Sequence, residues 1–195
     1  MASVIEIEAS FYLDDGYDNL IANVNNQGFE FEEKIVEEDT YYTDKSMSFI
    51  KDRICLRTRK TNEEYLELTY KPKTDDNTEK YGKKEVNLSI DPKDSKDVKY
   101  VLNELGYDVY VSFKKKREIY SKTINGFKYS VMIDEIENVG RYVELEILAH
   151  TEEEKEKLHD ELDNFVESMG CNKLREKDKP YRDIVKEYLE NTKNN

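Results

Sequence analysis

The residues with the clearest chemical potential are acids that recur at every second position. Glu6 and Glu8 stand two apart near the N-terminus, and Glu144 and Glu146 repeat that spacing after Asp134. Residues i and i+2 share one face of a β-strand, so each pair presents two carboxylates together. Crowded carboxylates repel one another and need a cation, and oxygen ligands without His or Cys favour Mg²⁺ or Mn²⁺. The pattern therefore predicts a divalent-metal site.

Basic residues follow the same spacing in the middle of the chain. Arg57 and Arg59 form one pair, Lys115 and Arg117 form another, and Lys71 lies between the pairs. Arg offers a planar fork and Lys a point charge, a combination suited to several phosphate groups. A half-buried sheet with its charged face in water is the plain alternative. The separation of acids from bases favours a metal-bridged polyphosphate site instead.

Segments of period two must position these residues, and they predict strands. The expected strands are 4–11, 35–42, 53–59, 65–71, 83–90, 109–121, 129–135 and 142–148. Asn125-Gly126 suits a tight hairpin turn. Helical spacing predicts helices at 17–26, 95–105, 151–169 and 180–189, the third opening with a capping box from Thr151 and Glu154.

So many short strands in one chain predict an α+β fold built on a closed eight-stranded antiparallel barrel. Closure would bring the first and last strands together, with the charged faces inside and the apolar faces under helices. We expect a single domain over 1–195, with the barrel at about 4–148 and C-terminal helices at about 151–190.

Composition narrows the function classes. The net charge of −13 argues against a general nucleic-acid-binding surface. The two cysteines lack metal-type spacing, and the sequence has no apolar run of membrane-spanning length. The acidic segment Met1 to Phe11 lacks a basic-plus-apolar pattern, so we do not expect it to act as a leader peptide. We expect a cytoplasmic protein with a small-molecule partner, no nucleic acid and no membrane, as a monomer or homodimer.

An ordered set of motifs resembles the CYTH family, the triphosphate tunnel metalloenzymes, over roughly residues 4–148. That family includes class IV adenylyl cyclases, thiamine triphosphatases and tripolyphosphatases. The matching elements are Glu6-x-Glu8-x-Ser10, Asp39-Thr40-Tyr41-Tyr42, Leu56-Arg57-Thr58-Arg59, Thr69-Tyr70-Lys71, Lys83-x-Glu85, Leu105-Gly106-Tyr107, Lys115-x-Arg117, Asp134-Glu135, Gly140 and Val143-Glu144-Leu145-Glu146.

The resemblance implies a role for each matched residue. The implied metal ligands, for Mg²⁺ or Mn²⁺, are Glu6, Glu8, Asp134, Glu144 and Glu146. The implied triphosphate-binding residues are Ser10, Arg57, Arg59, Lys71, Lys83, Lys115 and Arg117. Of these, Lys71, Lys115 and Arg117 are the expected catalytic residues.

Two positions depart from the family pattern. Ser10 stands where the family signature has Lys, and Lys83 stands where Arg is usual. Ser10 removes a charged phosphate contact, so we expect Ser10→Lys to raise any phosphatase activity. Three functions stay open: triphosphate hydrolysis, which asks least of the site, cyclisation of ATP to cyclic AMP and pyrophosphate, and polyphosphate or nucleotide binding without turnover.

Overall fold

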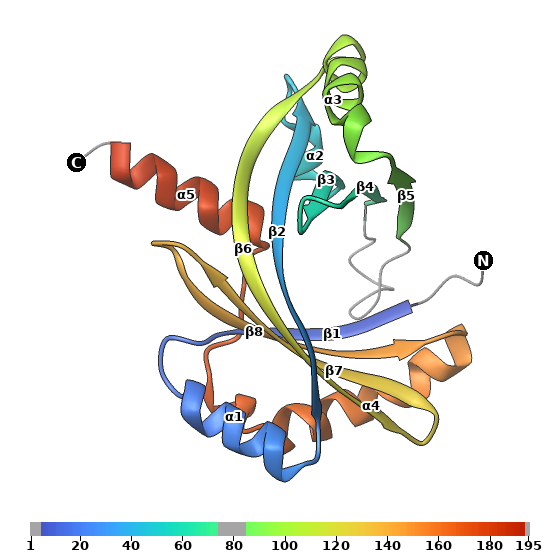
Figure 1. Ribbon diagram of the computed structural model, residues 1–195, viewed down its shortest axis with the longest axis vertical. Helices are drawn as coiled ribbons and strands as arrows, with labels where there is room; N and C mark the ends of the chain where they lie inside the picture. The colour runs from blue at the N-terminus through green and yellow to red at the C-terminus, as the bar shows by residue number, and fades with distance from the viewer. Residues whose placement is uncertain (1–4, 74–84, 194–195) are drawn as a thin grey trace. The chain divides into compact units, whose positions relative to one another are not determined.

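The computed structural model describes residues 5–73 and 85–193, and these residues form one eight-stranded sheet. Its strand order is β1-β8-β7-β6-β2-β3-β4-β5 (Figure 1). The pairs β1–β8, β7–β8, β2–β3, β3–β4 and β4–β5 are antiparallel. The strands are β1 (Ile5–Tyr12), β2 (Glu30–Asp44), β3 (Cys55–Thr61), β4 (Tyr65–Lys71), β5 (Val86–Ile90), β6 (Tyr107–Ile124), β7 (Phe127–Ile136) and β8 (Gly140–Ala149).

The antiparallel eight-stranded sheet is confirmed, but closure into a barrel is not shown. β1 and β5 stand at the two ends of the strand order, and no ladder joins them within the described part of the chain. The first and last strands are nevertheless neighbours, because β1 pairs directly with β8. The acidic strands therefore meet through that ladder, whether or not the sheet closes.

The expected helices are present. They are α1 (Tyr17–Asn26), α3 (Ser95–Glu104), α4 (Glu152–Ser168) and α5 (Tyr181–Lys193), and the structure adds the short α2 (Ser48–Lys51) with one-turn helices η1 (Pro92–Asp94) and η2 (Cys171–Lys173). The capping box at α4 is confirmed, since Thr151 and Glu154 each bond to the other's backbone N–H. No helix in 5–73 or 85–193 is long and apolar enough to cross a membrane.

The hairpin between β6 and β7 also forms as expected. Asn125 and Gly126 have φ of 51° and 88°, the left-handed conformation that a two-residue turn of this kind requires at both positions. The turn sets the course of β7, the strand that carries Asp134.

The chain divides into two compact units. The first comprises Met1–Ile35 and Lys116–Asp178, and the second comprises Val36–Lys115 and Lys179–Asn195. The division falls within β2 and β6, so each unit holds part of both strands. Each unit has its own apolar core and its own charged sheet face.

In the first unit the apolar face of β1, β8 and β7 is covered by helices. Ile7, Val131, Val143 and Leu145 have no exposed surface, and burying each such side chain contributes about 1.5–3 kcal/mol. α1 and α4 lie on this side of the strands (Figure 1), and Phe165 of α4 packs against aromatic rings of the unit. The opposite face of the same strands carries the acids, as the alternation predicts.

In the second unit β3 and β4 carry a smaller apolar core. Tyr42, Leu56 and Leu102 of α3 form its buried centre, and Phe49 of α2 packs against it. α5 is held to the same unit by Arg182, whose guanidinium donates to the backbone carbonyl of Ile54 at 2.5 Å. The basic residues occupy the other face of these strands.

Candidate functional site

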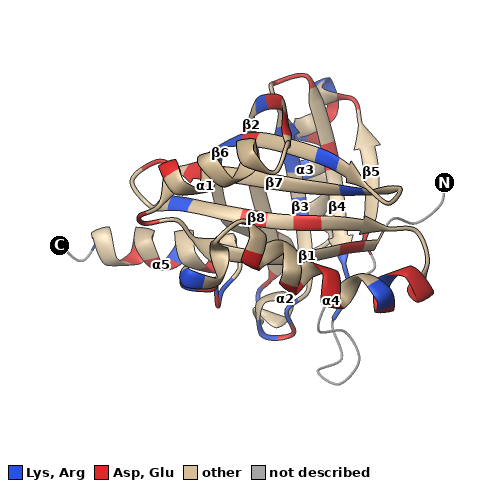
Figure 2. Cartoon of the chain, turned by 90° about the horizontal axis from the view of Figure 1, so that it is seen from below, with Lys and Arg blue, Asp and Glu red and all other residues tan. Residues whose placement is uncertain are grey.

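The carboxylates form one group in the first unit. In the β1–β8 ladder Glu8 lies opposite Glu146 and Ser10 lies opposite Glu144. Directly opposite residues share a sheet face, and Glu6 shares it too because it is two residues from Glu8. Figure 2 shows acidic positions along β8 and on neighbouring β1. The structure therefore brings together four of the five predicted metal ligands.

The pKa of Glu146 reflects the crowding of these carboxylates. Burial and the nearby charges of Glu6, Glu8 and Glu144 raise the pKa of its carboxyl to about 8, although Arg117 opposes the shift. A carboxyl group held in this way keeps its proton near neutral pH unless a cation takes the proton's place. The donor set thus fits a hard divalent ion, in charge and in ligand type.

The carboxylates do not form a complete coordination shell for a metal ion. Within the part of the chain that the structure describes, no group of three or more His, Cys, Asp or Glu is arranged to hold a metal ion. Glu144 is engaged by Arg117 and Lys177, at 2.5 Å and 3.1 Å. Metal binding here requires carboxylate side chains to rearrange.

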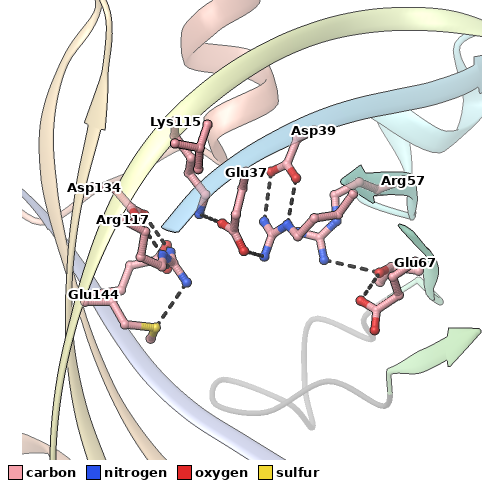
Figure 3. A network of polar contacts seen from close by, with 12 residues as sticks. Glu37, Asp39, Arg57, Glu67, Lys115, Arg117, Asp134 and Glu144 are labelled. Atoms are coloured by element: carbon pink, nitrogen blue, oxygen red, sulfur yellow. Dashed lines mark hydrogen bonds and ion pairs between the residues drawn. The ribbon is translucent and has the colours of Figure 1, made fainter. Parts of the chain in front are cut away.

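Arg117 on β6 forms ion pairs with two acids on this face. Its Nε and Nη2 donate to the two carboxylate oxygens of Asp134 at 2.6 and 2.5 Å, and Nη2 also donates to Glu144 (Figure 3). Asp134 has no exposed surface. Both of its oxygens are therefore used in holding the guanidinium, which favours a positioning role for Asp134 over direct metal ligation.

The basic residues form a second group, in the second unit. Arg57 lies opposite Thr69 on β4, and Cys55 lies opposite Lys71. Arg59 lies two residues from Arg57, so these bases share one face of the β3–β4 ladder. Burial raises the pKa of the Cys55 thiol, which keeps the thiol protonated and disfavours a nucleophilic role.

Two buried acids neutralise this face, and neither is among the site residues predicted from the sequence. Asp39 accepts bonds from Arg59 Nε and Nη2 at 2.7 and 2.8 Å, and Glu37 lies 2.9 Å from both Arg59 Nη1 and Lys115 Nζ (Figure 3). Burial alone would raise the pKa of Asp39, but Arg59, Arg57 and Lys115 outweigh it and hold that pKa well below its usual range. The sequence feature that could have identified these two acids is the spacing of Glu37, Asp39 and Tyr41, which places all three on one face of β2.

Lys71 and Arg57 share a third acid. Lys71 Nζ lies 2.5 Å from Glu85, and Arg57 Nη2 lies 3.8 Å from it. Glu85 thus lies beside two bases and can fix their orientation. Arg57 Nη2 also donates to Thr69 Oγ1 at 3.2 Å, while its buried Nε has no hydrogen-bond acceptor among the described residues. A buried guanidinium N–H of this kind is available to an anion.

The alternation on β6 is as predicted. Lys115 and Arg117 are buried, with 2% and 7% exposure, whereas Lys114 and Lys116 are exposed. Tyr181 of α5 is buried and places its ring 5.2 Å from Lys115 Nζ. Lys83, also predicted to bind phosphate, lies outside the described residues.

The two groups differ in the ligands that they suit. The acids of the first unit suit a hard cation, and the bases of the second unit suit phosphate oxygens. Every base in the described part of the second group has an acidic partner, so an anion must displace or share existing ion pairs.

Comparison with known proteins gives a consistent result. A model of the CYTH domain matches residues 4–177. The chain is 26% identical over 171 residues to a Methanocaldococcus jannaschii protein named "Putative adenylate cyclase MJ0240", covering 87% of this chain and 92% of that one.

Solved structures share the fold. The PH1819 protein of Pyrococcus horikoshii OT3 superposes with a TM-score of 0.71 at 25% identity, covering 95% of this chain and 99% of that one. HpAC1 from Hippeastrum, described as a "putative adenylyl cyclase" with a dominant triphosphatase activity, gives a TM-score of 0.61 at 15% identity, covering 86% and 88%.

Proposed function

Because this chain belongs to the CYTH domain family, we propose that it is a divalent-metal-dependent triphosphate hydrolase. The substrate class is inorganic tripolyphosphate, thiamine triphosphate or a nucleoside triphosphate. The observation that supports this proposal is that buried charges of opposite sign lie on different strand pairs. Crowded carboxylates on β1 and β8 raise the pKa of Glu146, and a row of Arg and Lys lies on β3 and β4. The proposal includes closure of the sheet into a barrel with the charged residues inside.

The bases bind and orient the triphosphate in this proposal. Arg57 and Arg59 offer planar N–H forks, while Lys71, Lys83 and Lys115 offer point charges. Arg117 is held in a fixed orientation by Asp134. In hydrolysis a water oxygen forms a bond to the terminal phosphorus and the bond from that phosphorus to the bridging oxygen breaks. The diphosphate leaving group takes the electron pair, and the proton that the water loses passes to solvent. Lys71, Lys115 and Arg117 stabilise the charge that develops on the phosphate oxygens.

The carboxylates supply the metal-binding half. Glu6, Glu8, Glu144 and Glu146 would hold Mg²⁺ or Mn²⁺, with Asp134 fixing Arg117 beside them. A bound divalent ion would neutralise phosphate charge and lower the pKa of water. Without the cation, these carboxylates would repel the negatively charged phosphates.

ATP cyclisation is the second candidate function. Its support is the name of the Methanocaldococcus jannaschii relative, an adenylate cyclase. Cyclisation needs a nucleoside pocket beside the triphosphate site, whereas hydrolysis needs only the polyphosphate chain and a placed water. Binding without turnover is the third candidate, supported by Ser10 at the position of the signature lysine.

One assay set separates the three candidates. The protein is incubated with tripolyphosphate, thiamine triphosphate and ATP, each with Mg²⁺, Mn²⁺ or EDTA. We expect metal-dependent release of inorganic phosphate. Cyclic AMP with pyrophosphate would establish the cyclase instead, and tight binding without any product would establish a binding module.

A further inference from the structure

One buried arginine of the second unit belongs to neither of the charged groups described above. Arg182 lies in the first turn of α5, and only 4% of its surface is exposed. Its Nη1 donates to the Ile54 carbonyl at 2.5 Å, whereas its buried Nε has no hydrogen-bond acceptor among the described residues. A buried donor without an acceptor costs free energy, so this guanidinium has hydrogen-bonding capacity that an incoming anion can use.

The acid beside Arg182 does not satisfy that donor. Asp183 Oδ1 lies 3.5 Å from Arg182 Nε, but neither atom makes a hydrogen bond to a described residue. Burial raises the pKa of the Asp183 carboxyl, although Arg182 opposes the shift. Consecutive residues of a helix do not face each other, which explains the poor alignment of the two side chains. Asp183 is therefore a weak counter-ion for Arg182.

The contact with Ile54 brings Arg182 to the start of β3. The next residue, Cys55, shares a strand face with Arg57. Cys55 also lies opposite Lys71 in the β3–β4 ladder. Burial raises the pKa of the Cys55 thiol, and three positive charges oppose that rise, those of Arg57, Lys71 and Arg182. The surroundings of Cys55 thus receive one base from each of β3, β4 and α5.

Arg57 has the same unmet capacity as Arg182. Its buried Nε also lacks an acceptor among the described residues. Its Nη2 lies 3.8 Å from Glu85, the acid that Lys71 Nζ contacts at 2.5 Å. A phosphate group has several oxygens and can accept from two guanidinium donors at once. Cys55 and Lys71 are partly exposed, which gives such an anion access to these bases.

We propose that Arg182 is a phosphate-binding residue, which extends the basic row of β3 and β4 past Cys55 to the first turn of α5. The inference rests on the proposed function and adds a base that lies outside the sequence motifs. In the resting protein the Ile54 carbonyl holds the guanidinium through Nη1. When a triphosphate binds, Nε donates to an oxygen of the phosphate group beside Cys55, while the Nη1 contact keeps the planar fork in place.

The test compares two variants of the full-length protein. Arg182→Gln removes the charge but keeps an N–H donor for the Ile54 carbonyl, whereas Arg182→Lys keeps the charge. Affinity for tripolyphosphate is measured by calorimetry in EDTA, and the KM for its hydrolysis is measured with Mg²⁺. Because a charged hydrogen bond is lost, we expect Arg182→Gln to weaken binding and raise KM at least about tenfold. Arg182→Lys should bind more tightly than Arg182→Gln.

Arg53→Gln is the matched control. It makes the same substitution at an exposed arginine next to Ile54. We expect wild-type affinity and KM from it, and thermal unfolding of each variant identifies any loss of folding. An equal loss in Arg53→Gln and Arg182→Gln would show that general electrostatic attraction is responsible, and it would overturn the inference.

The Cys55 thiol gives a second readout, which needs no variant. A phosphate group bound beside Cys55 covers the thiol, so excess tripolyphosphate should slow its alkylation by iodoacetamide at pH 9. Mass spectrometry measures the labelling of each cysteine separately. Cys171, which has 1% exposure and lies in the first unit, is the internal reference, and its labelling should not change.

Failure of the inference and failure of the proposed function give different results. Suppose that wild type binds and hydrolyses tripolyphosphate. If Arg182→Gln then does so equally well, if Arg182→Lys is no better than Arg182→Gln, or if bound tripolyphosphate leaves Cys55 unprotected, the inference fails and the proposed function stands. If wild type neither binds nor hydrolyses any triphosphate, the proposed function fails and this inference with it.

Discussion

Lys115 and Glu37 form a buried ion pair, with Nζ 2.9 Å from Oε2 and side-chain exposures of 1% and 6%. Glu37 also lies 2.9 Å from Arg59 Nη1. One carboxylate therefore holds two of the proposed phosphate-binding residues in place. We therefore expect the loss of this pair to lower the free energy of unfolding more directly than it lowers the reaction rate.

Replacing Glu37 with Gln should destabilise the protein strongly. It would remove the carboxylate that pairs with Lys115 and one of the two carboxylates that pair with Arg59, and breaking a buried pair costs about 3–5 kcal/mol. Urea unfolding measures the loss. The control is Glu38→Gln on the opposite face of β2, where the acid is 39% exposed and pairs with exposed Lys114, so a change of at most about 1 kcal/mol is expected. Equal effects from the two variants would contradict the role of Glu37.

Arg117→Lys should reduce both stability and turnover. A lysine cannot make the forked contact with Asp134, and Asp134 would keep a buried oxygen without its charged donor. We expect a loss of about 1.5–3 kcal/mol in unfolding free energy and at least about tenfold in kcat/KM. Lys116→Met, the exposed neighbour on β6, should leave both measurements unchanged. A fully active and stable Arg117→Lys would show that the forked contact is dispensable.

Stability without metal should fall as pH rises. The pKa of Glu146 is about 8 in the folded protein, against an ordinary value of 4.5. The folded state then holds a proton that the unfolded state has lost between these values, so the free energy of unfolding decreases with pH across this window. Urea unfolding in EDTA at pH 5, 6.5 and 8 checks the slope.

Glu146→Gln supplies the control for this slope, because the neutral amide removes the titrating group. It should flatten the pH dependence between pH 5 and 8. A wild-type slope that is flat or rising would contradict the raised pKa.

Binding of Mg²⁺ or Mn²⁺ should show the opposite trend. The metal needs ionised carboxylates, so apparent affinity should increase from pH 6 to pH 8 and binding should release protons. Calorimetry in buffers of different ionisation enthalpy measures the released protons. An affinity independent of pH would indicate that Glu146 is not among the ligands.

Glu6→Gln combined with Glu8→Gln should abolish metal-dependent turnover. Both residues belong to the acid group on β1 and both raise the pKa of Glu146, so the double variant should also return that pKa toward its ordinary value. Phosphate release from tripolyphosphate with Mg²⁺ and with Mn²⁺ is the measurement. Full activity in this variant would refute the assignment of the β1 acids as metal ligands.

Much of the fold could be read from local patterns. Period-two alternation placed Arg57 with Arg59 and Glu6 with Glu8 because neighbouring side chains on a strand must point to opposite faces. The boundaries of α1 and the capping box of α4 were predicted for the same kind of reason, since helical spacing and backbone capping are decided within a few residues.

Contacts between distant segments could not be read in this way. Nothing in the spacing of Glu37 shows that it lies between Lys115 and Arg59, because pairing register depends on how whole strands align. Closure of the barrel is likewise a long-range property, and the described strands leave β1 and β5 at opposite ends of the order.

The sequence by itself determined which residues share a strand face, and with it the separation of acids from bases. Only the tertiary structure decided which charge meets which: that Asp134 fixes Arg117, and that Lys177 lies beside Ser10 and contacts Glu144. The physical reason is that the direction of a side chain follows from local backbone geometry, whereas its ionic partner follows from the packing of segments far apart in the chain.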